Sequence, residues 1–259
     1  MNSGLEVIDI SKFFDGVQSL DSVSLSVSTG NLDGLIGSNG AGKTTLFNIV
    51  AGEVHQDSGT VKVDGEIFDG YPTFLRAQKG IARTFQKVQV FGDLSVLEHV
   101  AIAIRARLLS HKRMSTVRYV LNMFKNGDVT CDEAEEIFPL LRELGIESSA
   151  KKLVKTLSLG NIRMVELARA LALRPKVLLL DEPSSGMDEF EISNFIEVVT
   201  KLKIENSCAI LIVEHDIGLI KRLTDNVTVL DAGKVLASGK TQEVLEYQRV
   251  KELFSSKRQ

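Results

Sequence analysis

The most informative part of this 259-residue chain is the stretch GSNGAGKTT, Gly37–Thr45. It fits the pattern G-x-x-x-x-G-K-[ST], in which a glycine-rich backbone wraps around phosphate oxygens with its N–H groups turned inward. Lys43 would bring a positive charge to the β- and γ-phosphates, and Thr44 would offer a hydroxyl to Mg²⁺. The alternative is a glycine-rich turn with a surface lysine, since the pattern arises by chance in about one in a hundred chains of this length.

The segments on both sides favour the phosphate-binding interpretation. DGLIG, Asp33–Gly37, is typical of a buried strand, and TTLFNIVAG, Thr44–Gly52, is typical of a helix. A helix N-terminus attracts anions because its first N–H groups have no partners within the helix. The sequence therefore predicts a nucleoside triphosphate site formed by Gly37, Ser38, Asn39, Gly40, Ala41, Gly42, Lys43, Thr44 and Thr45.

Two further predicted strands end in residues suited to phosphate chemistry. The apolar strand in KVLLLDEP, 176–183, ends in Asp181 and Glu182. A carboxylate at the carboxyl edge of a parallel sheet can hold Mg²⁺, and the next carboxylate can orient or deprotonate a water molecule. LIVEHD, 211–216, brings His215 to the end of another strand, where an imidazole could contact the γ-phosphate or that water. Taken alone, an acidic turn or a single histidine is often structural.

The order of the predicted elements indicates an α/β protein. Residues 5–10 and 22–27 alternate as strands do, and Asp64-Gly65 signals a hairpin between two short strands. Apolar residues recur at helical spacing within 96–147. After Leu159, helices and strands alternate, which is typical of a parallel sheet with crossover helices. We therefore expect a parallel-sheet core, an N-terminal antiparallel β subdomain and an inserted α-helical subdomain.

Composition narrows the functional class. With 44% hydrophobic and 25% charged residues and a formal charge of −3, the chain is typical of a globular protein, and no nucleic-acid partner is expected. No apolar run reaches the roughly 18 to 20 residues of a membrane helix, and the N-terminus lacks a signal-peptide pattern. Cys131 and Cys208 are predicted to be buried, inert thiols, and His55, His99 and His111 to be surface or structural residues.

The stretch LSLGNIR, 157–163, contains an unusual glycine at a helix start. Ser158 is a good N-cap for the predicted helix that follows it. Gly160, however, costs that helix about 1 kcal/mol relative to alanine. The glycine indicates that some group approaches the helix start so closely that a side chain at position 160 would be in the way.

Together, these motifs resemble those of the ATP-binding subunits of ABC transporters. The phosphate-binding stretch is followed by RTFQ (83–86), LSLGN (157–161), LLLDEPSSGMD (178–188) and EHD (214–216). The resemblance spans nearly the whole chain. Within that superfamily, GLIGSNGAGKTTLFNIVAG, GIARTFQ and LSVLEHV look most like the importers of branched-chain amino acids and related solutes.

The resemblance implies a P-loop NTPase fold of the RecA-like type, within one ABC ATPase domain spanning 1–259. Residues 1–90 and 155–240 would form the nucleotide-binding core with its β subdomain. Residues 91–154 would form the helical signature subdomain, and 241–259 a C-terminal helix or tail.

The resemblance also implies roles for single residues around ATP and Mg²⁺. Phe14 would stack on adenine, with Phe13 as the competing candidate and an apolar core position as the alternative. Gln86 would reach Mg²⁺ and water through a loop that also contacts the membrane subunit. The remaining roles are Mg²⁺ binding for Asp181, catalysis for Glu182, the switch histidine for His215 and sensing of the opposite subunit for Asp188.

In the family that the chain resembles, the LSLGN helix faces the γ-phosphate of ATP bound to the partner subunit. Ser158 and Gly160 would then meet that phosphate through a hydroxyl and bare N–H groups, in the favourable field of the helix dipole. Leu159 stands where glycine or a bulkier residue is usual, Asn161 replaces the usual glutamine, and Asn31 follows Gly30 where glutamate is common. None of these departures removes a phosphate or metal ligand.

The implied partners follow from the same resemblance. They are a second ATPase subunit (identical or related), integral membrane permease subunits, and an extracytoplasmic solute-binding protein, with the chain peripheral on the cytoplasmic face of the cell membrane. Val88, Val90 and Phe91 would line a groove for a permease helix, or alternatively fill the seam between the subdomains.

Other functions are weighed against the importer ATPase. The main alternative is the ATPase of an exporter or of a lipid or lipopolysaccharide transport system. A soluble ABC ATPase of DNA repair or translation is disfavoured because the chain has one cassette and no heptad run. A nucleotide-binding regulator without turnover is disfavoured because Asp181, Glu182 and His215 are all present.

Overall fold

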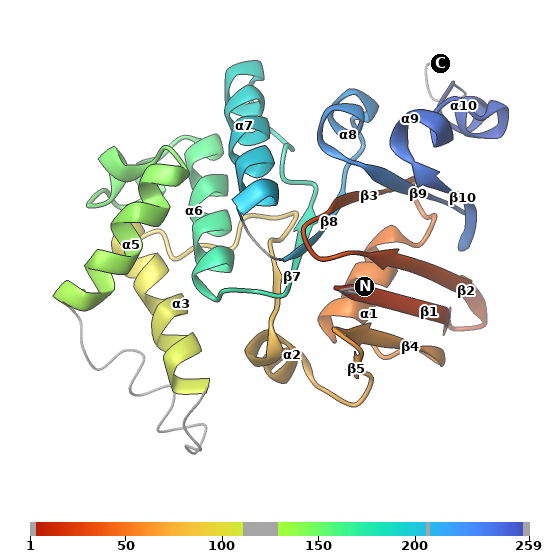
Figure 1. Cartoon of the computed structure of the whole chain (residues 1–259), viewed down its shortest axis with the longest axis horizontal. Coiled ribbons are helices and arrows are strands. Elements are labelled where there is room, and N and C mark those ends of the chain that lie inside the picture. Colours follow the sequence, from red (N-terminus) through yellow and green to blue (C-terminus); the bar gives the residue numbers. More distant parts are fainter. Residues whose placement is uncertain (1–3, 111–128, 206–207, 256–259) are drawn as a thin grey trace. The chain divides into compact units, whose positions relative to one another are not determined.

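The computed structural model in Figure 1 describes residues 4–110, 129–205 and 208–255. The chain forms two compact units. The core unit comprises Met1–Arg83, Lys176–Glu182 and Val199–Gln259, and the helical unit comprises Thr84–Pro175 and Pro183–Val198. The helical segment expected at 91–154 lies within the helical unit. This unit also contains the helix Leu159–Ala172, which follows Ser158.

A six-stranded, mostly parallel sheet forms the centre of the core unit. Its strand order is β10-β9-β3-β8-β7-β6, and only the β9–β10 pair is antiparallel. Strands β3, β7 and β8 are buried along their whole length, as apolar strands covered on both faces are. The predicted parallel core is confirmed. The strands are β3 (Leu32–Gly37), β6 (Ile81–Arg83), β7 (Val177–Asp181), β8 (Ala209–Val213), β9 (Asn226–Asp231) and β10 (Lys234–Lys240).

A second, four-stranded antiparallel sheet completes the β structure of the core unit. Its order is β2-β1-β4-β5, formed by β1 (Leu5–Phe14), β2 (Val17–Val27), β4 (Ser58–Val63) and β5 (Glu66–Ile67). Val63 pairs with Glu66, which confirms the predicted hairpin. Asp64 and Gly65 between them have φ of 50° and 79°, the left-handed conformations that a two-residue I′ turn requires.

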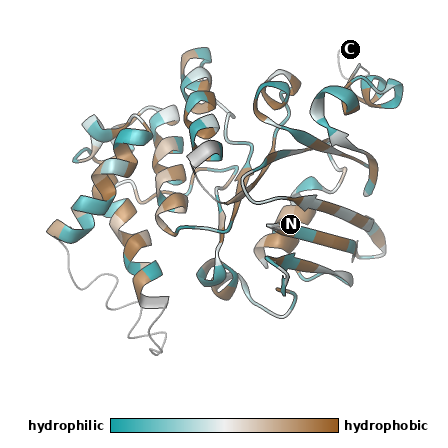
Figure 2. Ribbon diagram, in the orientation of Figure 1, coloured by the Kyte–Doolittle hydropathy of each residue, from teal (hydrophilic) through white to brown (hydrophobic). Residues whose placement is uncertain are grey.

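Helix α1 (Lys43–Ala51) shares a hydrophobic core with both sheets. Leu46 and Phe47 of α1 are buried in one cluster with Leu20 from the antiparallel sheet and Leu179 from the parallel sheet. Figure 2 shows this helix largely in the brown of apolar residues. Each such side chain contributes about 1.5–3 kcal/mol when fully buried, so this packing fixes where α1 begins. The other helices of the core unit are α2 (Thr73–Lys79), α8 (Ile217–Leu223), α9 (Thr241–Val244) and α10 (Gln248–Ser255).

The helical unit is built from α3 (Val96–Ser110), α5 (Cys131–Glu143), α6 (Leu159–Ala172) and the first part of α7 (Glu189–Glu205). Short 3₁₀ turns at Glu147–Ser149 and Val154–Thr156 connect α5 to α6. Two ion pairs join α3 to α5, one from Arg105 to Glu133 at 2.6 Å and one from Arg107 to Glu136 at 2.7 Å. Glu133 also forms a capping box with Thr130 at the start of α5.

Two expectations about single residues have clear outcomes. The prediction that Cys131 is buried is wrong, because it is exposed in the first turn of α5, whereas Cys208 is buried as expected. His99 is buried and hydrogen-bonded, and His55 is exposed, which agrees with their interpretation as structural or surface residues. His111 and the predicted chain break KNGD lie outside the described residues.

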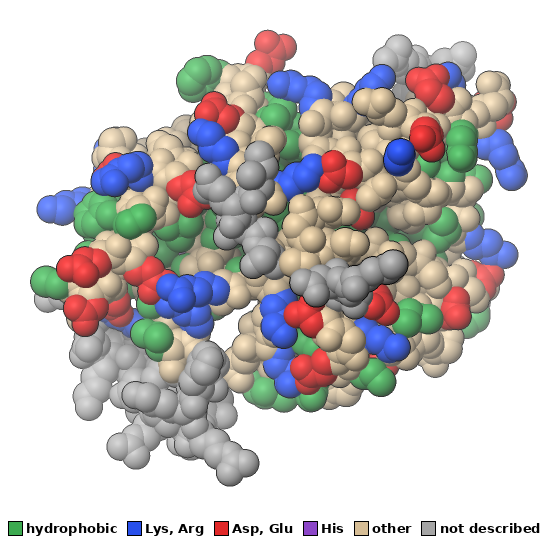
Figure 3. All heavy atoms as spheres, in the orientation of Figure 1, with side chains coloured by type: hydrophobic (Ala, Val, Ile, Leu, Met, Phe, Trp, Pro, Cys, Tyr) green, Lys and Arg blue, Asp and Glu red, His purple; other side chains and the backbone are tan. Residues whose placement is uncertain are grey.

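Surface properties agree with the composition. Among the described residues, every helix is too short or too polar to cross a lipid bilayer. On the face drawn in Figure 3, the described positive and negative side chains are interspersed rather than gathered into one large patch of either sign.

One buried carboxylate makes the stability of the fold depend on pH. Asp33 lies on β3 and accepts a hydrogen bond of 3.0 Å from Asn226 Nδ2. Burial raises the pKa of Asp33 from 3.8 to about 6, against the effect of that hydrogen bond. The folded state therefore binds this proton more tightly than the unfolded state, and the free energy of unfolding falls as pH rises from about 4 to about 6.

We predict that Asp33→Asn raises the free energy of unfolding at pH 8 by up to about 3 kcal/mol and has little effect at pH 4. The asparagine removes the buried charge but keeps an oxygen for Asn226. Urea denaturation at the two pH values measures the difference. An equal or larger gain at pH 4 would contradict this account.

Candidate active site

The phosphate-binding stretch is the turn between β3 and α1. Gly42 ends it with a φ of 102°, and a Cβ there would lie 2.6 Å from Leu20 Cδ2 and 2.7 Å from the Ser19 carbonyl oxygen. Only glycine fits this position without a local shift. The Lys43 ammonium donates to the carbonyl oxygens of Gly37 and Ser38, both at 2.9 Å. The Lys43 ammonium therefore lies against the backbone of Gly37 and Ser38, which the sequence pattern predicts to surround a phosphate.

The first turn of α1 is arranged to receive an anion. Gly42 is its N-cap residue and has no side chain that could cap the helix. Thr44 is exposed, whereas the Thr45 hydroxyl lies 2.9 Å from that of Ser19. A helix start of this kind presents N–H groups and a positive dipole end, which a phosphate can satisfy.

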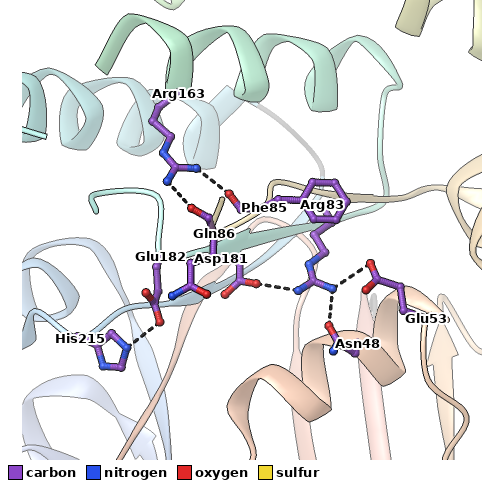
Figure 4. A network of polar contacts seen from close by, with 9 residues as sticks. All are labelled: Asn48, Glu53, Arg83, Phe85, Gln86, Arg163, Asp181, Glu182 and His215. Atoms are coloured by element: carbon purple, nitrogen blue, oxygen red, sulfur yellow. Dashed lines mark hydrogen bonds and ion pairs between the residues drawn. The ribbon is translucent and has the colours of Figure 1, made fainter. Parts of the chain in front are cut away.

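Asp181 lies at the same edge of the parallel sheet as this turn. In the strand register, Asp181 pairs with Val213 of β8, and Val213 pairs with Leu35 of β3. The Asp181 carboxylate is buried and accepts a hydrogen bond of 2.7 Å from Arg83 Nη2 (Figure 4). The carboxyl ends of these parallel strands therefore bring the buried carboxylate and the phosphate-binding turn to one sheet edge.

Arg83 is a residue whose importance sequence reasoning missed, although the RTFQ motif contains it. Its Nη1 atom donates to Asn48 Oδ1 at 2.8 Å and to Glu53 Oε1 at 3.1 Å. The guanidinium therefore ties Asp181 to α1, the helix that begins at the phosphate-binding turn. The partners lie far apart in sequence, since Asp181 comes 98 positions after Arg83, so no local pattern could have joined them.

Glu182 and His215 meet at the ends of β7 and β8. His215 Nε2 lies 2.6 Å from Glu182 Oε1 (Figure 4). Glu182 adopts a φ of 45°, which is uncommon for a residue with a side chain and costs about 1–3 kcal/mol. Its backbone N–H donates to the Val213 carbonyl at 2.9 Å, so the sheet holds it in this conformation. The strained backbone and the imidazole fix the carboxylate where the sequence predicted a base.

In the helical unit, α6 holds the segment that contains Gln86. Arg163 donates to the carbonyl oxygens of Phe85 and Gln86, both at 2.6 Å (Figure 4). Arg163 is buried and paired with the buried Glu166 at 3.0 Å. Glu166 in turn accepts from the backbone N–H of Gln89 at 3.0 Å.

Arg169 adds a further bond to the same segment, donating to the Gln89 carbonyl at 2.9 Å. Burial lowers the pKa of Arg169, and Glu166 opposes this effect. Sequence reasoning missed the roles of Arg163, Glu166 and Arg169. The available signal was their charge on a helix that otherwise presents apolar residues, with Arg163 and Glu166 at i, i+3 spacing. These contacts join the residue 85–89 segment and α6 into one structure.

The start of α6 is as predicted, but a second helix meets it. Ser158 is the N-cap residue, and its hydroxyl accepts from the Asn161 N–H at 3.3 Å, which confirms the predicted cap. The same hydroxyl donates to Glu191 Oε1 of α7 at 2.9 Å, and the Gly160 N–H donates to that oxygen at 3.2 Å. Asp188 caps α7 by accepting from the Glu191 N–H at 2.8 Å. The contact of Glu191 with the start of α6 was also not predicted from the sequence.

The aromatic candidates for adenine stacking end β1 and are both exposed. Phe14 is 45% exposed and Phe13 is 47% exposed, so the alternative of an apolar core position for Phe14 is wrong. The Lys12 ammonium lies 5.3 Å from the centre of the Phe14 ring. Exposure does not distinguish the two phenylalanines, but either ring can be reached by a flat heterocycle.

The proposed permease-facing residues belong to the helical unit. Phe91 is 59% exposed and stacks on His99, with ring centroids 5.8 Å apart. His99 Nε2 also lies 3.1 Å from the Phe91 nitrogen and 2.9 Å from its carbonyl oxygen. Burial lowers the pKa of His99, so the ring supports Phe91 in its neutral form near pH 7. Val88 and Val90 are partly buried.

Each unit thus contains one group of the predicted site residues. The core unit holds the phosphate-binding turn, Asp181, Glu182 and His215, together with Phe14. The helical unit holds Gln86, Ser158, Gly160 and Asp188.

Comparison with known proteins identifies the family. A model of the family described as "ABC transporter" matches residues 20–185. The chain belongs to the ABC transporter ATP-binding family. It is therefore a nucleotide-binding subunit of an ABC transporter and an ATPase, as the sequence predicted. The alternatives of a regulator without turnover or of an ATPase in DNA repair or translation are not supported.

Named relatives and solved structures agree with this assignment. The chain is 31% identical to the high-affinity branched-chain amino acid transport ATP-binding protein BraF of Pseudomonas aeruginosa, over 93% of this chain and 92% of that protein. It is 32% identical to the lipopolysaccharide export system ATP-binding protein LptB of Haemophilus influenzae, over 95% and 94%. The ADP conformation of MJ1267, an ATP-binding cassette of an ABC transporter, aligns with a TM-score of 0.86 at 27% identity, covering 99% of this chain and 100% of that one.

We predict that Arg163→Met lowers the free energy of unfolding by about 3–5 kcal/mol, because Glu166 would remain buried without its ionic partner. Urea denaturation measures this loss. The double variant Arg163→Met with Glu166→Gln serves as the control and should recover part of it, since the unpaired charge is gone. A loss below about 1 kcal/mol for the single variant would show that the pair does not hold the 85–89 segment.

Proposed function

We propose that this ABC subunit binds ATP with Mg²⁺ at the β3–α1 turn and hydrolyses it when two subunits pair. The observation that carries this proposal is the hydrogen bond of 2.6 Å between Glu182 and His215, at the sheet edge where the phosphate-binding turn also lies. That geometry gives a fixed carboxylate, a polar imidazole and an ammonium within one unit, and such groups can orient water and neutralise phosphate charge in phosphoryl transfer.

The residues of the core unit fit Mg²⁺. The Thr44 hydroxyl and the Asp181 carboxylate are hard oxygen donors, which Mg²⁺ prefers. The described residues contain no cluster of three or more His, Cys, Asp or Glu side chains that could hold a metal alone. Mg²⁺ commonly takes only one or two protein ligands and completes its shell with phosphate oxygens and water. We propose Gln86 as a further oxygen ligand. When bound, Mg²⁺ would neutralise charge on the β- and γ-phosphates.

The proposed roles of the protein groups follow from their positions. The Lys43 ammonium exchanges the carbonyls of Gly37 and Ser38 for β- and γ-phosphate oxygens. Glu182 accepts a proton from water, or orients it, as the water oxygen bonds to the γ-phosphorus. The bond from that phosphorus to the β–γ bridging oxygen breaks, and ADP and inorganic phosphate leave. His215 holds the Glu182 carboxylate in place during this step.

The helical unit is proposed to complete the site of a second subunit. Ser158 and Gly160 would donate to the γ-phosphate of ATP bound to the partner, and Asp188 would contact the partner's phosphate-binding turn. Phe14, which belongs to the core unit, would stack on adenine. Because ATP would bind the paired state more tightly than the separate state, its binding and hydrolysis would drive pairing and separation. The pair is made of two copies of this chain or of this chain and a related one.

The transport role is proposed from the relatives. BraF bears a name of high-affinity branched-chain amino acid transport, so we propose that this subunit powers uptake of branched-chain amino acids or similar small solutes. It would act at the cytoplasmic face of the cell membrane with permease subunits that dock near Phe91 and with an extracytoplasmic solute-binding protein. The similarity to LptB makes lipopolysaccharide export the second candidate.

For the catalytic role, we predict that Glu182→Gln lowers steady-state ATP hydrolysis at least about 100-fold while ATP still binds. The amide keeps the shape of the side chain but cannot accept the proton. Phosphate release measures turnover, and calorimetry measures ATP binding. The variant should also accumulate as an ATP-bound dimer in size-exclusion chromatography. Turnover at the parent rate would remove Glu182 from this role.

For the cargo, deletion of the gene in the native host should abolish most high-affinity uptake of radiolabelled leucine, isoleucine and valine. Reintroduction of the parent chain should restore uptake, and Glu182→Gln should not. Normal uptake combined with loss of lipopolysaccharide from the cell surface would favour the second candidate instead.

A further inference from the structure

The start of α6 already holds an anion in the separate chain. Glu191 Oε1 accepts hydrogen bonds from the Ser158 hydroxyl at 2.9 Å and from the Gly160 N–H at 3.2 Å. Its other oxygen, Oε2, accepts from the Asp188 N–H at 3.2 Å. One carboxylate thus takes three donors from the starts of α6 and α7, where both helix dipoles favour negative charge.

Gly160 is shaped for this carboxylate. A Cβ at position 160 would lie 2.3 Å from Glu191 Cδ and 2.5 Å from Oε1, closer than side chains approach one another. Because Gly160 has no side chain, the Glu191 carboxylate of the same chain can lie directly beside it. The close approach that the glycine predicted is made here by a carboxylate of the same protein.

A helix-capping role for Glu191 explains only its two hydrogen bonds with Asp188. As the third residue of α7, Glu191 forms a capping box with Asp188, its N–H donating to Asp188 Oδ1 and its Oε2 accepting from the Asp188 N–H. A helix cap does not need Oε1 to reach across to α6. The bonds to Ser158 and Gly160 are additional, and they occupy the donors that the proposed function assigns to a phosphate.

We propose that Glu191 is a built-in occupant of the partner-ATP site, which must leave before the γ-phosphate can bind. This inference rests on the proposed function, because it requires ATP of a second subunit to reach Ser158 and Gly160. The hydroxyl proton and the Gly160 N–H cannot serve both anions, and two like charges a few ångströms apart repel. Glu191 therefore raises the ATP concentration needed for pairing, and its return after phosphate release helps the subunits separate.

The test measures ATP-driven dimerisation of the full chain in the Glu182→Gln background, where hydrolysis does not consume the ligand. Sedimentation velocity over a protein dilution series, with ATP and Mg²⁺, gives the dimer dissociation constant. We expect Glu191→Gln to tighten the dimer about tenfold, because the amide can still accept a hydrogen bond but carries no charge to oppose the phosphate. Glu191→Asp, which keeps the charge but shortens its reach toward α6, should tighten it less.

Glu189→Gln is the matched control. Glu189 lies in the same first turn of α7 and is exposed, and its side chain has the same charge as that of Glu191. Its removal should change the dissociation constant by no more than about twofold, which separates the effect of the Glu191 contacts from that of overall charge. Thermal unfolding of each variant without nucleotide checks that the fold is intact.

The outcomes are distinguishable. If the Glu182→Gln parent dimerises with ATP but Glu191→Gln matches Glu189→Gln or weakens the dimer, Glu191 is a helix cap only and this inference is overturned while the proposed function stands. If the parent itself stays monomeric with saturating ATP, the proposed paired site is wrong and the inference falls with it.

Discussion

Every α-helix begins with backbone N–H groups that its own carbonyls cannot reach, and this chain depends on how three of its helices meet that requirement. Helix α1 begins after Gly42, which has no side chain that could cap it, and this suits the helix start to a phosphate. Helix α6 begins with the Ser158 cap, and α7 with the Asp188 cap. The Glu191 carboxylate lies between the starts of α6 and α7. The same physical need thus suits one helix start to a phosphate and is met at two others by the Glu191 carboxylate.

Buried ion pairs hold the functional segments of each unit in position. Such pairs add little net stability, because desolvation offsets their attraction, but removing one partner is costly. In the core unit, Arg83 links Asp181 to Asn48, so the candidate metal ligand and helix α1 share one guanidinium. In the helical unit, Arg163 and Glu166 hold the segment after Phe85 against α6. Both pairs therefore matter more for the position of these segments than for the net free energy of unfolding.

The contacts of α6 join two regions of the helical unit. The segment proposed to meet the permease and the helix start proposed to meet the partner's ATP belong to one bonded structure within the helical unit. A displacement of Gln86 and Gln89 would therefore be passed to α6 through Arg163, Glu166 and Arg169. The permease contact and the partner's ATP would then be coupled directly through α6.

Local patterns were enough to predict the fold class, the glycine-rich turn within Gly37–Thr45, several of the strands and helices, and the family. The spacing within Gly37–Thr45, the alternation of the strands and the Ser158 cap are all properties of neighbouring residues. The structure alone decided the strand order, the exposure of Phe14 and Cys131, and the partners of the charged side chains. Arg83 meets Asp181 across 98 positions, and Ser158 meets Glu191 across 33. Contacts of that length depend on how strands and helices pack, which no short stretch of sequence specifies.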